Sequence, residues 1–239
     1  MIRYIIFDKD GTLIDFEAFW GTMTINAVRD ILQSVGADPD LTDEIMELYG
    51  YHDGVADITG LFAGGTYEMI TDATFELLTK KGYTLEYDSF YKLLKDKFHE
   101  HSSAGEVKAT CDDIVGFMEE LKKRGILCAV VTSDDSHVAK KCLDALGVTE
   151  YFDAIYAADG VEPAKPDPYY INKLCAEKGY AKDEVLMVGD TLIDAEFAKN
   201  GGIKMVGVAK SEENKNTLLP VANAVVHDIS KIFDVIDKI

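Results

Sequence analysis

Two carboxylates one residue apart, Asp8 and Asp10, end a short apolar run near the start of the chain, and Gly11 and Thr12 follow them directly. An aspartate can attack phosphorus in line and form an aspartyl-phosphate, which divides one difficult transfer into two easier steps. A second carboxylic acid nearby can protonate the leaving oxygen and later act as base for the incoming water. Taken alone, the pair could equally form a solvated turn or a helix N-cap; with further polar groups beside it, it would suit phosphoryl transfer through a covalent intermediate.

Polar residues follow three later apolar runs in the same way. They are Thr132 and Ser133 after residues 127–131, Lys165 after residues 154–158, and Asp190 with Asp194 after residues 185–188. In open α/β sheets, ligands bind beyond the carboxyl ends of the strands. If these runs are strands of one sheet, a single edge of that sheet carries four carboxylates, two hydroxyls and an ammonium group.

The charge of such a site predicts a metal ion. A transferring phosphoryl group is negatively charged, so its site must supply positive charge and hydrogen-bond donors. Lys165, Thr132 and the N–H groups of the loops can supply some of these. The four aspartates beside a phosphate dianion could not all stay ionised on one lysine. Oxygen ligands with room for water suit Mg²⁺, which is the predicted cofactor.

The elements that must position these residues form an alternating pattern. The apolar runs lack strict in–out alternation, as is typical of strands buried on both faces. They lie at residues 4–7, 127–131, 154–158, 185–188, 205–209 and 224–226. Helical patterns that end in glycine lie between the later runs, at residues 111–125, 136–147, 167–179 and 194–202. This order predicts an α/β fold with a parallel sheet and helices on both of its faces.

Residues 16–100 interrupt this alternation. Apolar residues such as Phe19 and Met23 fall there at helical spacing, and no convincing strand is visible. A crossover between parallel strands usually needs only about a dozen residues. This segment is therefore predicted to be an inserted all-helical domain, and residues 1–15 and 101–239 are predicted to form the catalytic core.

Composition limits the partners of the protein. The formal net charge is −19 over 239 residues, of which 47% are hydrophobic. This hydrophobic content is enough for a large core. The negative charge repels nucleic acids and anionic membranes, so the protein is not expected to bind either of them. No run approaches the roughly 18 apolar residues of a membrane span, and Asp8 interrupts the first run too early for a signal peptide. Four unpaired cysteines are expected as reduced thiols, so the predicted location is cytoplasmic.

The ordered motifs resemble those of the haloacid dehalogenase superfamily, in its phosphatase branch. "DKDGTL" resembles the first motif of that family, "VVTS" the second, the lysine of "AKPDP" the third, and "VGDTLIDAEFAKNGG" the fourth. Together they span residues 8 to 202 in the order of the family. The resemblance implies a Rossmann-like core, with the insertion after the first motif as a helical cap domain.

The resemblance also implies roles for the residues of the core. Asp8 is the expected nucleophile and Asp10 the expected general acid and base. Thr132 and Ser133 are expected to bind the phosphoryl oxygens, and Lys165 to orient the phosphate and the nucleophile.

The expected metal ligands come from the first and fourth motifs. By resemblance, Asp190 coordinates Mg²⁺ together with Asp8 and the backbone carbonyl of Asp10. Asp194 supports the metal directly or through water.

These expectations favour a Mg²⁺-dependent phosphatase that acts on a small phosphorylated metabolite, of the phosphoglycolate or sugar-phosphate type. A phosphosugar mutase of the same family is the first alternative, because the mutases keep the acid at the position of Asp10. A receiver-like regulatory module, which holds phosphate on an aspartate as a signal, is the second. The sequence leaves the substrate, the residues of the cap that select it, and the oligomeric state open.

Overall fold

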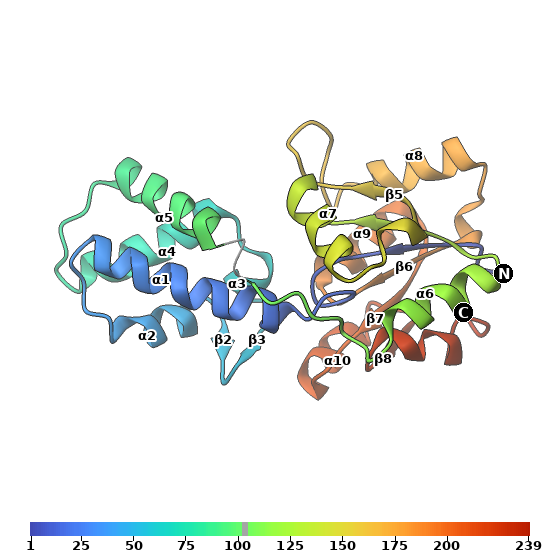
Figure 1. The fold of residues 1–239 in the computed structure, drawn as a ribbon, viewed down its shortest axis with the longest axis horizontal. Coiled ribbons are helices and arrows are strands. Elements are labelled where there is room, and N and C mark those ends of the chain that lie inside the picture. Colours follow the sequence, from blue (N-terminus) through green and yellow to red (C-terminus); the bar gives the residue numbers. More distant parts are fainter. Residues whose placement is uncertain (102–104) are drawn as a thin grey trace. The chain divides into compact units, whose positions relative to one another are not determined.

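The computed structural model describes residues 1–101 and 105–239 (Figure 1). The chain divides into two compact units, one formed by Met1–Asp15 with Val107–Ile239 and one by Phe16–Glu106. Sequence analysis placed the second boundary after residue 100, and helix α5 continues to His101. Residues 102–104, which were assigned to the core, lie outside the described residues.

The first unit is built on a six-stranded parallel sheet with the order β5-β4-β1-β6-β7-β8. The strands are β1 (Tyr4–Phe7), β4 (Leu127–Val131), β5 (Phe152–Tyr156), β6 (Val185–Gly189), β7 (Lys204–Val208) and β8 (Ala224–Val226). All residues of β1 and β6 are buried, as expected for strands covered on both faces. The predicted α/β fold with a Rossmann-like parallel sheet is thus confirmed.

The register of the sheet brings three strand ends together. Strand β1 lies between β4 and β6, with Phe7 opposite Val130 and Val188. Because the pairing is parallel, the loops after β1, β4 and β6 leave the same edge of the sheet. The loops that carry the predicted site residues are therefore neighbours.

Helices flank the sheet in the first unit (Figure 1). They are α6 (Ile114–Lys123), α7 (Ser136–Ala145), α8 (Tyr169–Lys178), α9 (Leu192–Gly201) and α10 (Glu212–Leu218), with 3₁₀ segments η2 (Thr149–Tyr151), η3 (Lys182–Glu184) and η4 (Ile229–Asp234). Side-chain caps begin several of them: Asp135 accepts from the N–H of Val138, and Thr191 accepts from that of Asp194. These caps fix where each helix leaves the edge of the sheet.

The second unit is mainly helical. It contains the π-helical segment η1 (Glu17–Gly21) and helices α1 (Thr22–Ser34), α2 (Leu41–Leu48), α3 (Leu61–Gly64), α4 (Tyr67–Lys80) and α5 (Tyr87–His101). Helices α1, α2, α4 and α5 share a core of their own, in which Met23, Tyr49 and Leu94 are buried. The unit thus has the hydrophobic core of an independent domain.

One expectation for this segment was wrong. Sequence analysis found no strand between residues 16 and 100, but a two-stranded antiparallel ladder joins β2 (Tyr51–His52) to β3 (Val55–Ala56). Asp53 and Gly54 both have positive φ, which is the backbone that a tight hairpin turn requires. Two residues per strand are too few to produce a recognisable alternation.

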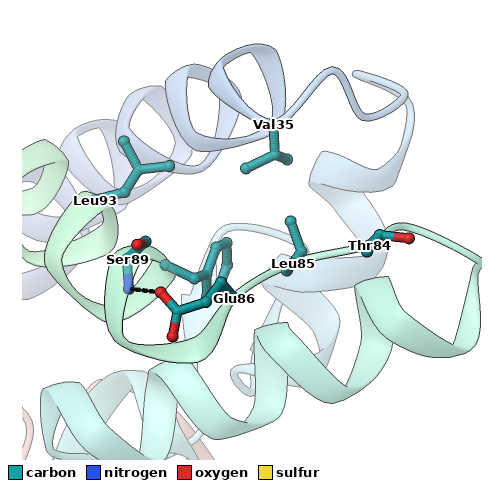
Figure 2. Close-up of a pocket in the computed structure, with 7 residues that line it drawn as sticks. Val35, Thr84, Leu85, Glu86, Ser89 and Leu93 are labelled. Carbon is teal, nitrogen blue, oxygen red and sulfur yellow. Dashed lines mark hydrogen bonds between the residues drawn. The ribbon is translucent and has the colours of Figure 1, made fainter.

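A small pocket of about 210 Å³ lies in the second unit, between α1, the start of α5 and the segment before it (Figure 2). Val35, Leu85 and Leu93 line it, together with Glu86, which accepts a hydrogen bond from the backbone N–H of Ser89. None of the predicted site residues lines this pocket. Among the described residues, no helix combines the length and apolar character needed to cross a membrane.

Candidate active site

The centre of the candidate site is a buried ion cluster at the ends of β1 and β6. The ammonium of Lys165 lies 2.5 Å from Oδ1 of Asp8 and 2.7 Å from Oδ1 of Asp194. The side chains of all three residues are at most 8% exposed. A charged group that is removed from water is destabilising unless an opposite charge pairs with it. Lys165, Asp8 and Asp194 would each lose their partner if they separated, so their pairing favours this one arrangement.

A third carboxylate completes a cluster of oxygen ligands. Carboxylate oxygens of Asp8, Asp190 and Asp194 all lie within 4.8 Å of one another. Three hard oxygen donors that face one point are what Mg²⁺ or a similar cation requires, and Lys165 alone leaves them with excess negative charge. The donor set therefore fits the predicted metal ion. The carboxylate of Asp10 is not part of this set, and the expected contribution of its backbone carbonyl stays a prediction.

Two glycines let these carboxylates approach the backbone. A Cβ on Gly11, whose φ is +74°, would lie 2.0 Å from Oδ2 of Asp190. A Cβ on Gly189 would lie 2.5 Å from the Cβ and Cγ atoms of Asp194. Non-bonded atoms essentially never lie this close to a Cβ, so a side chain at either position would force the neighbouring carboxylate to shift.

Hydroxyl groups orient two of the carboxylates. The side chain of Thr12 donates to Oδ1 of Asp190 at 3.1 Å. Thr191 donates to Oδ2 of Asp194 at 2.7 Å through its hydroxyl, and its backbone N–H donates to the same oxygen at 3.1 Å. Asp194 thus forms a reciprocal capping box with Thr191 in the first turn of helix α9, while its other oxygen accepts from Lys165.

Burial and like charge perturb the titration of the cluster. Burial, opposed by Lys165 and reinforced by Asp194 and Asp10, raises the pKa of Asp8 to about 7. Burial and the charges of Asp8 and Asp194 raise the pKa of Asp190 well above its ordinary value. Burial alone would lower the pKa of Lys165, but Asp194 and Asp8 raise it above that of a free lysine. Perturbed groups of this kind are concentrated at functional sites.

Thr132 and Ser133 lie at the end of β4, beside β1 in the sheet. Thr132 is buried, and its hydroxyl accepts a hydrogen bond from the N–H of Asp134 at 3.2 Å. Ser133 is exposed. Sequence analysis assigned both to the phosphate, and the structure places them at the same sheet edge as Asp8.

Asp10 is held by a residue that sequence analysis did not single out. The ammonium of Lys9 lies 2.6 Å from Oδ1 of Asp10 and 2.9 Å from Oδ2 of Asp134. The Lys9 side chain is completely buried. Burial alone would lower the pKa of Lys9, but the two carboxylates raise it above its ordinary value. A lysine between two aspartates at the end of an apolar run was the only signal for this arrangement in the sequence.

A comparison with protein-family models matches residues 2–202 to the haloacid dehalogenase-like hydrolases. A phosphoglycolate phosphatase from Aquifex aeolicus is 30% identical over 213 residues, which cover 85% of this chain and 83% of that enzyme. This match extends through both units of the structure.

Solved structures share the fold over nearly the whole chain. A candidate beta-phosphoglucomutase from Thermotoga maritima superimposes with a TM-score of 0.66, is 26% identical and covers 100% of both chains. The YfnB protein of Bacillus subtilis, a candidate hydrolase of this family in a magnesium-bound form, gives a TM-score of 0.73 at 18% identity, with 99% of each chain covered.

Proposed function

This chain belongs to the haloacid dehalogenase-like hydrolases, and we propose that it is a Mg²⁺-dependent phosphatase that hydrolyses a small phosphate monoester through an aspartyl-phosphate on Asp8. The observation that carries the proposal is the buried contact of Lys165 with Asp8, next to the carboxylates of Asp190 and Asp194. It holds a nucleophile, a cation and a set of metal ligands at one edge of the sheet.

In the first half of the reaction, an oxygen of Asp8 attacks phosphorus and the bond to the ester oxygen breaks. Asp10 donates its proton to that oxygen, so that the leaving group departs as a neutral alcohol. In the second half, Asp10 accepts a proton from water while the water oxygen attacks phosphorus. The bond to Asp8 then breaks, phosphate leaves, and both aspartates return to their starting forms.

The ammonium of Lys165 and the hydroxyls of Thr132 and Ser133 bind the phosphoryl group that is transferred. Lys165 neutralises the nucleophile and a phosphoryl oxygen, and Thr132 and Ser133 supply hydrogen bonds from the end of β4. Asp8, Asp190, Asp194 and the backbone carbonyl of Asp10 would hold Mg²⁺, which would supply positive charge to stabilise the phosphoryl group. The protein as a whole is strongly acidic and would repel an anionic substrate. The positive charges of Lys165 and of the bound Mg²⁺ would offset this repulsion at the site.

The substrate class follows from the relatives. The Aquifex aeolicus protein is a phosphoglycolate phosphatase, and its similarity covers most of both chains. We therefore place phosphoglycolate and sugar phosphates first among the substrates. Phe16–Glu106 is proposed as the cap domain, which carries the residues that choose between them.

A phosphosugar mutase is the second candidate, because the Thermotoga maritima protein is a candidate beta-phosphoglucomutase and matches the whole chain. In a mutase, the aspartyl-phosphate returns its phosphoryl group to a sugar hydroxyl instead of water. Isomerised sugar phosphate with little free phosphate would identify this activity.

The test is phosphate release from a panel of phosphoglycolate, sugar phosphates, nucleotides and pyrophosphate, measured with Mg²⁺ and with a chelator. We expect metal-dependent release that is greatest for one of the small monoesters. Absence of phosphate release from the whole panel, in the presence of Mg²⁺, would contradict the proposed function.

A further inference from the structure

A completely buried lysine joins the proposed general acid to a carboxylate of the neighbouring strand end. Lys9 lies between Asp8 and Asp10 in the loop after β1, and Asp134 lies in the loop after β4. The ammonium of Lys9 contacts both Asp10, at 2.6 Å, and Asp134, at 2.9 Å. Strands β1 and β4 pair directly, so the sheet register fixes the separation of the two carboxylates that share this cation.

Stability alone is a weak reason for such a group. A buried ion pair contributes little net stability, since the desolvation cost of the charges offsets their attraction, and apolar residues of similar volume often do as well. The Lys9 side chain is 0% exposed, whereas those of Asp10 and Asp134 retain 18% and 17% exposure. The lysine therefore lies beneath the two carboxylates, which are partly open to solvent at the edge of the sheet.

The position of Asp10 matters for proton transfer. A general acid must lie within hydrogen-bond reach of the oxygen that it protonates, and a displacement of about 1 Å can reduce the rate by roughly 100-fold. The carboxylate of Asp10 lies outside the cluster of Asp8, Asp190 and Asp194. Oδ1 of Asp10 accepts a hydrogen bond of 2.6 Å from the ammonium of Lys9, and this contact restrains the carboxylate.

We propose that Lys9 is a positioning residue for Asp10 and that Asp134 anchors Lys9, so that the three side chains together hold the general acid in place. This inference rests on the proposed phosphatase function. Lys9 takes part in no bond-making step. Its effect is confined to steps in which Asp10 transfers a proton.

The consequence is a dependence on the leaving group. An alkyl phosphate releases a strongly basic alkoxide unless an acid protonates it, whereas 4-nitrophenyl phosphate releases a weakly basic phenolate that needs little help. Loss of correct positioning should therefore slow the alkyl ester much more than the aryl ester. A general loosening of the core would slow both esters alike.

The test compares kcat/KM for an alkyl phosphate and for 4-nitrophenyl phosphate, because this constant reports the steps up to formation of the phosphoenzyme. The variants are Lys9→Met, which keeps the length of the side chain without its charge, and Asp134→Asn, which keeps the shape of the anchor. Lys210→Met is the control, since it removes a lysine from an ion pair with Asp15 in the same unit, 2.8 Å long, and Lys210 has no assigned role in the site.

We expect Lys9→Met to lower the ratio of alkyl to aryl kcat/KM by about 10-fold or more, as a fraction of the roughly 10²- to 10⁴-fold effect of a general acid. Asp134→Asn should lower the ratio in the same direction by a smaller factor, and Lys210→Met should leave it unchanged. Equal losses on both esters in both variants would overturn the inference while the proposed function stands. If Lys9→Met does not fold, the ratio of alkyl to aryl kcat/KM in Asp134→Asn tests the inference: a lowered ratio supports it and an unchanged ratio overturns it. If the wild-type protein hydrolyses neither ester, the proposed function fails and the inference is overturned with it.

Discussion

Lys165 and Asp8 are 157 residues apart in the sequence, yet Nζ of the lysine lies 2.5 Å from Oδ1 of the aspartate. The same ammonium lies 2.7 Å from Asp194, which lies in the first turn of the helix after β6. One cation thus links the loops that follow three different strands, β1, β5 and β6. The parallel sheet makes this possible, because it delivers its loops to one edge.

Replacement of this cation should therefore remove activity. We expect Lys165→Met to lower kcat by roughly 10²- to 10³-fold, the loss that follows removal of a single stabilising donor at a developing charge. Circular dichroism should show a retained fold when Mg²⁺ is present to neutralise the carboxylates. The Lys210→Met variant is the control, and activity of Lys165→Met equal to that of this control would contradict the assigned role.

Because Gly11 lies close to Asp190, the single methyl group added by Gly11→Ala should have a strong effect on metal binding. Gly11→Ala should weaken Mg²⁺ activation by roughly 10- to 100-fold, the usual effect of disturbing a group that supports a metal ligand, because its Cβ would lie 2.0 Å from Oδ2 of Asp190. Gly125→Ala provides a matched control. Gly125 has φ +72° and no atom within 4 Å of an added Cβ.

The control should lose only about 1 kcal/mol of stability, the cost of the left-handed backbone for alanine. Its Mg²⁺ dependence, measured as the half-saturating concentration for phosphate release, should match that of the wild-type protein. Equal Mg²⁺ dependence of Gly11→Ala and Gly125→Ala would show that the contact with Asp190 is unimportant.

Raised carboxylate pKa values predict how stability depends on pH without metal. The folded-state pKa of Asp8 is raised to about 7 and that of Asp190 is also raised, in both cases first by burial. Between the ordinary aspartate pKa and these values, the folded state binds more protons than the unfolded state, so the free energy of unfolding falls as pH rises. In a chelator, the melting temperature should therefore be higher at pH 5.5 than at pH 8.

Asp190→Asn removes one of these groups and should reduce this pH dependence. Thermal melts across the pH range in chelator test the point. A melting temperature that rises from pH 5.5 to pH 8 in chelator would contradict the burial of like charges at this site.

Metal binding should reverse the loss of stability that the ionised carboxylates cause at high pH. A cation that binds only the folded state stabilises it by about 2.7 kcal/mol at 100 times its Kd. We expect Mg²⁺ to raise the melting temperature of the wild-type protein at pH 8, and to raise it much less in Asp190→Asn. The cluster Asp8, Asp190 and Asp194 would be excluded as the metal site if the two proteins showed the same shift with Mg²⁺.

The strands that carry the site could be predicted because their residues are buried on both faces. Residues 4–7 and 127–131 were predicted with the bounds that the structure gives β1 and β4. The third run was placed at 154–158, two residues later than β5 (Phe152–Tyr156). Its end is set by pairing with β4, where Val131 lies opposite Tyr156, and no local apolar pattern contains that information.

Other elements left no pattern to recognise. Helix α10 (Glu212–Leu218) was missed because its only buried residue is Leu218, so it lacks an apolar stripe. The β2–β3 hairpin was missed because its strands have two residues each. Both elements depend on local turn and cap geometry more than on periodicity.

In the site, the aspartates and Lys165 could be named from the sequence because they follow apolar runs in order. Lys9 could not be interpreted in the same way. Its partner Asp134 is 125 positions further along the chain and becomes a neighbour only through the pairing of β1 with β4. A lysine beside two aspartates is otherwise typical of a solvated loop.

The central claim is that Asp8 carries the phosphoryl group during turnover. The most direct test is an acid quench of the protein during reaction with Mg²⁺ and its best substrate, followed by mass spectrometry of the peptide that contains Asp8. We expect a fraction of this peptide to gain the mass of one phosphoryl group. That fraction should be absent in Asp8→Asn, which should also release no phosphate. Phosphate release by Asp8→Asn at the wild-type rate, with no modified peptide in any variant, would contradict the account.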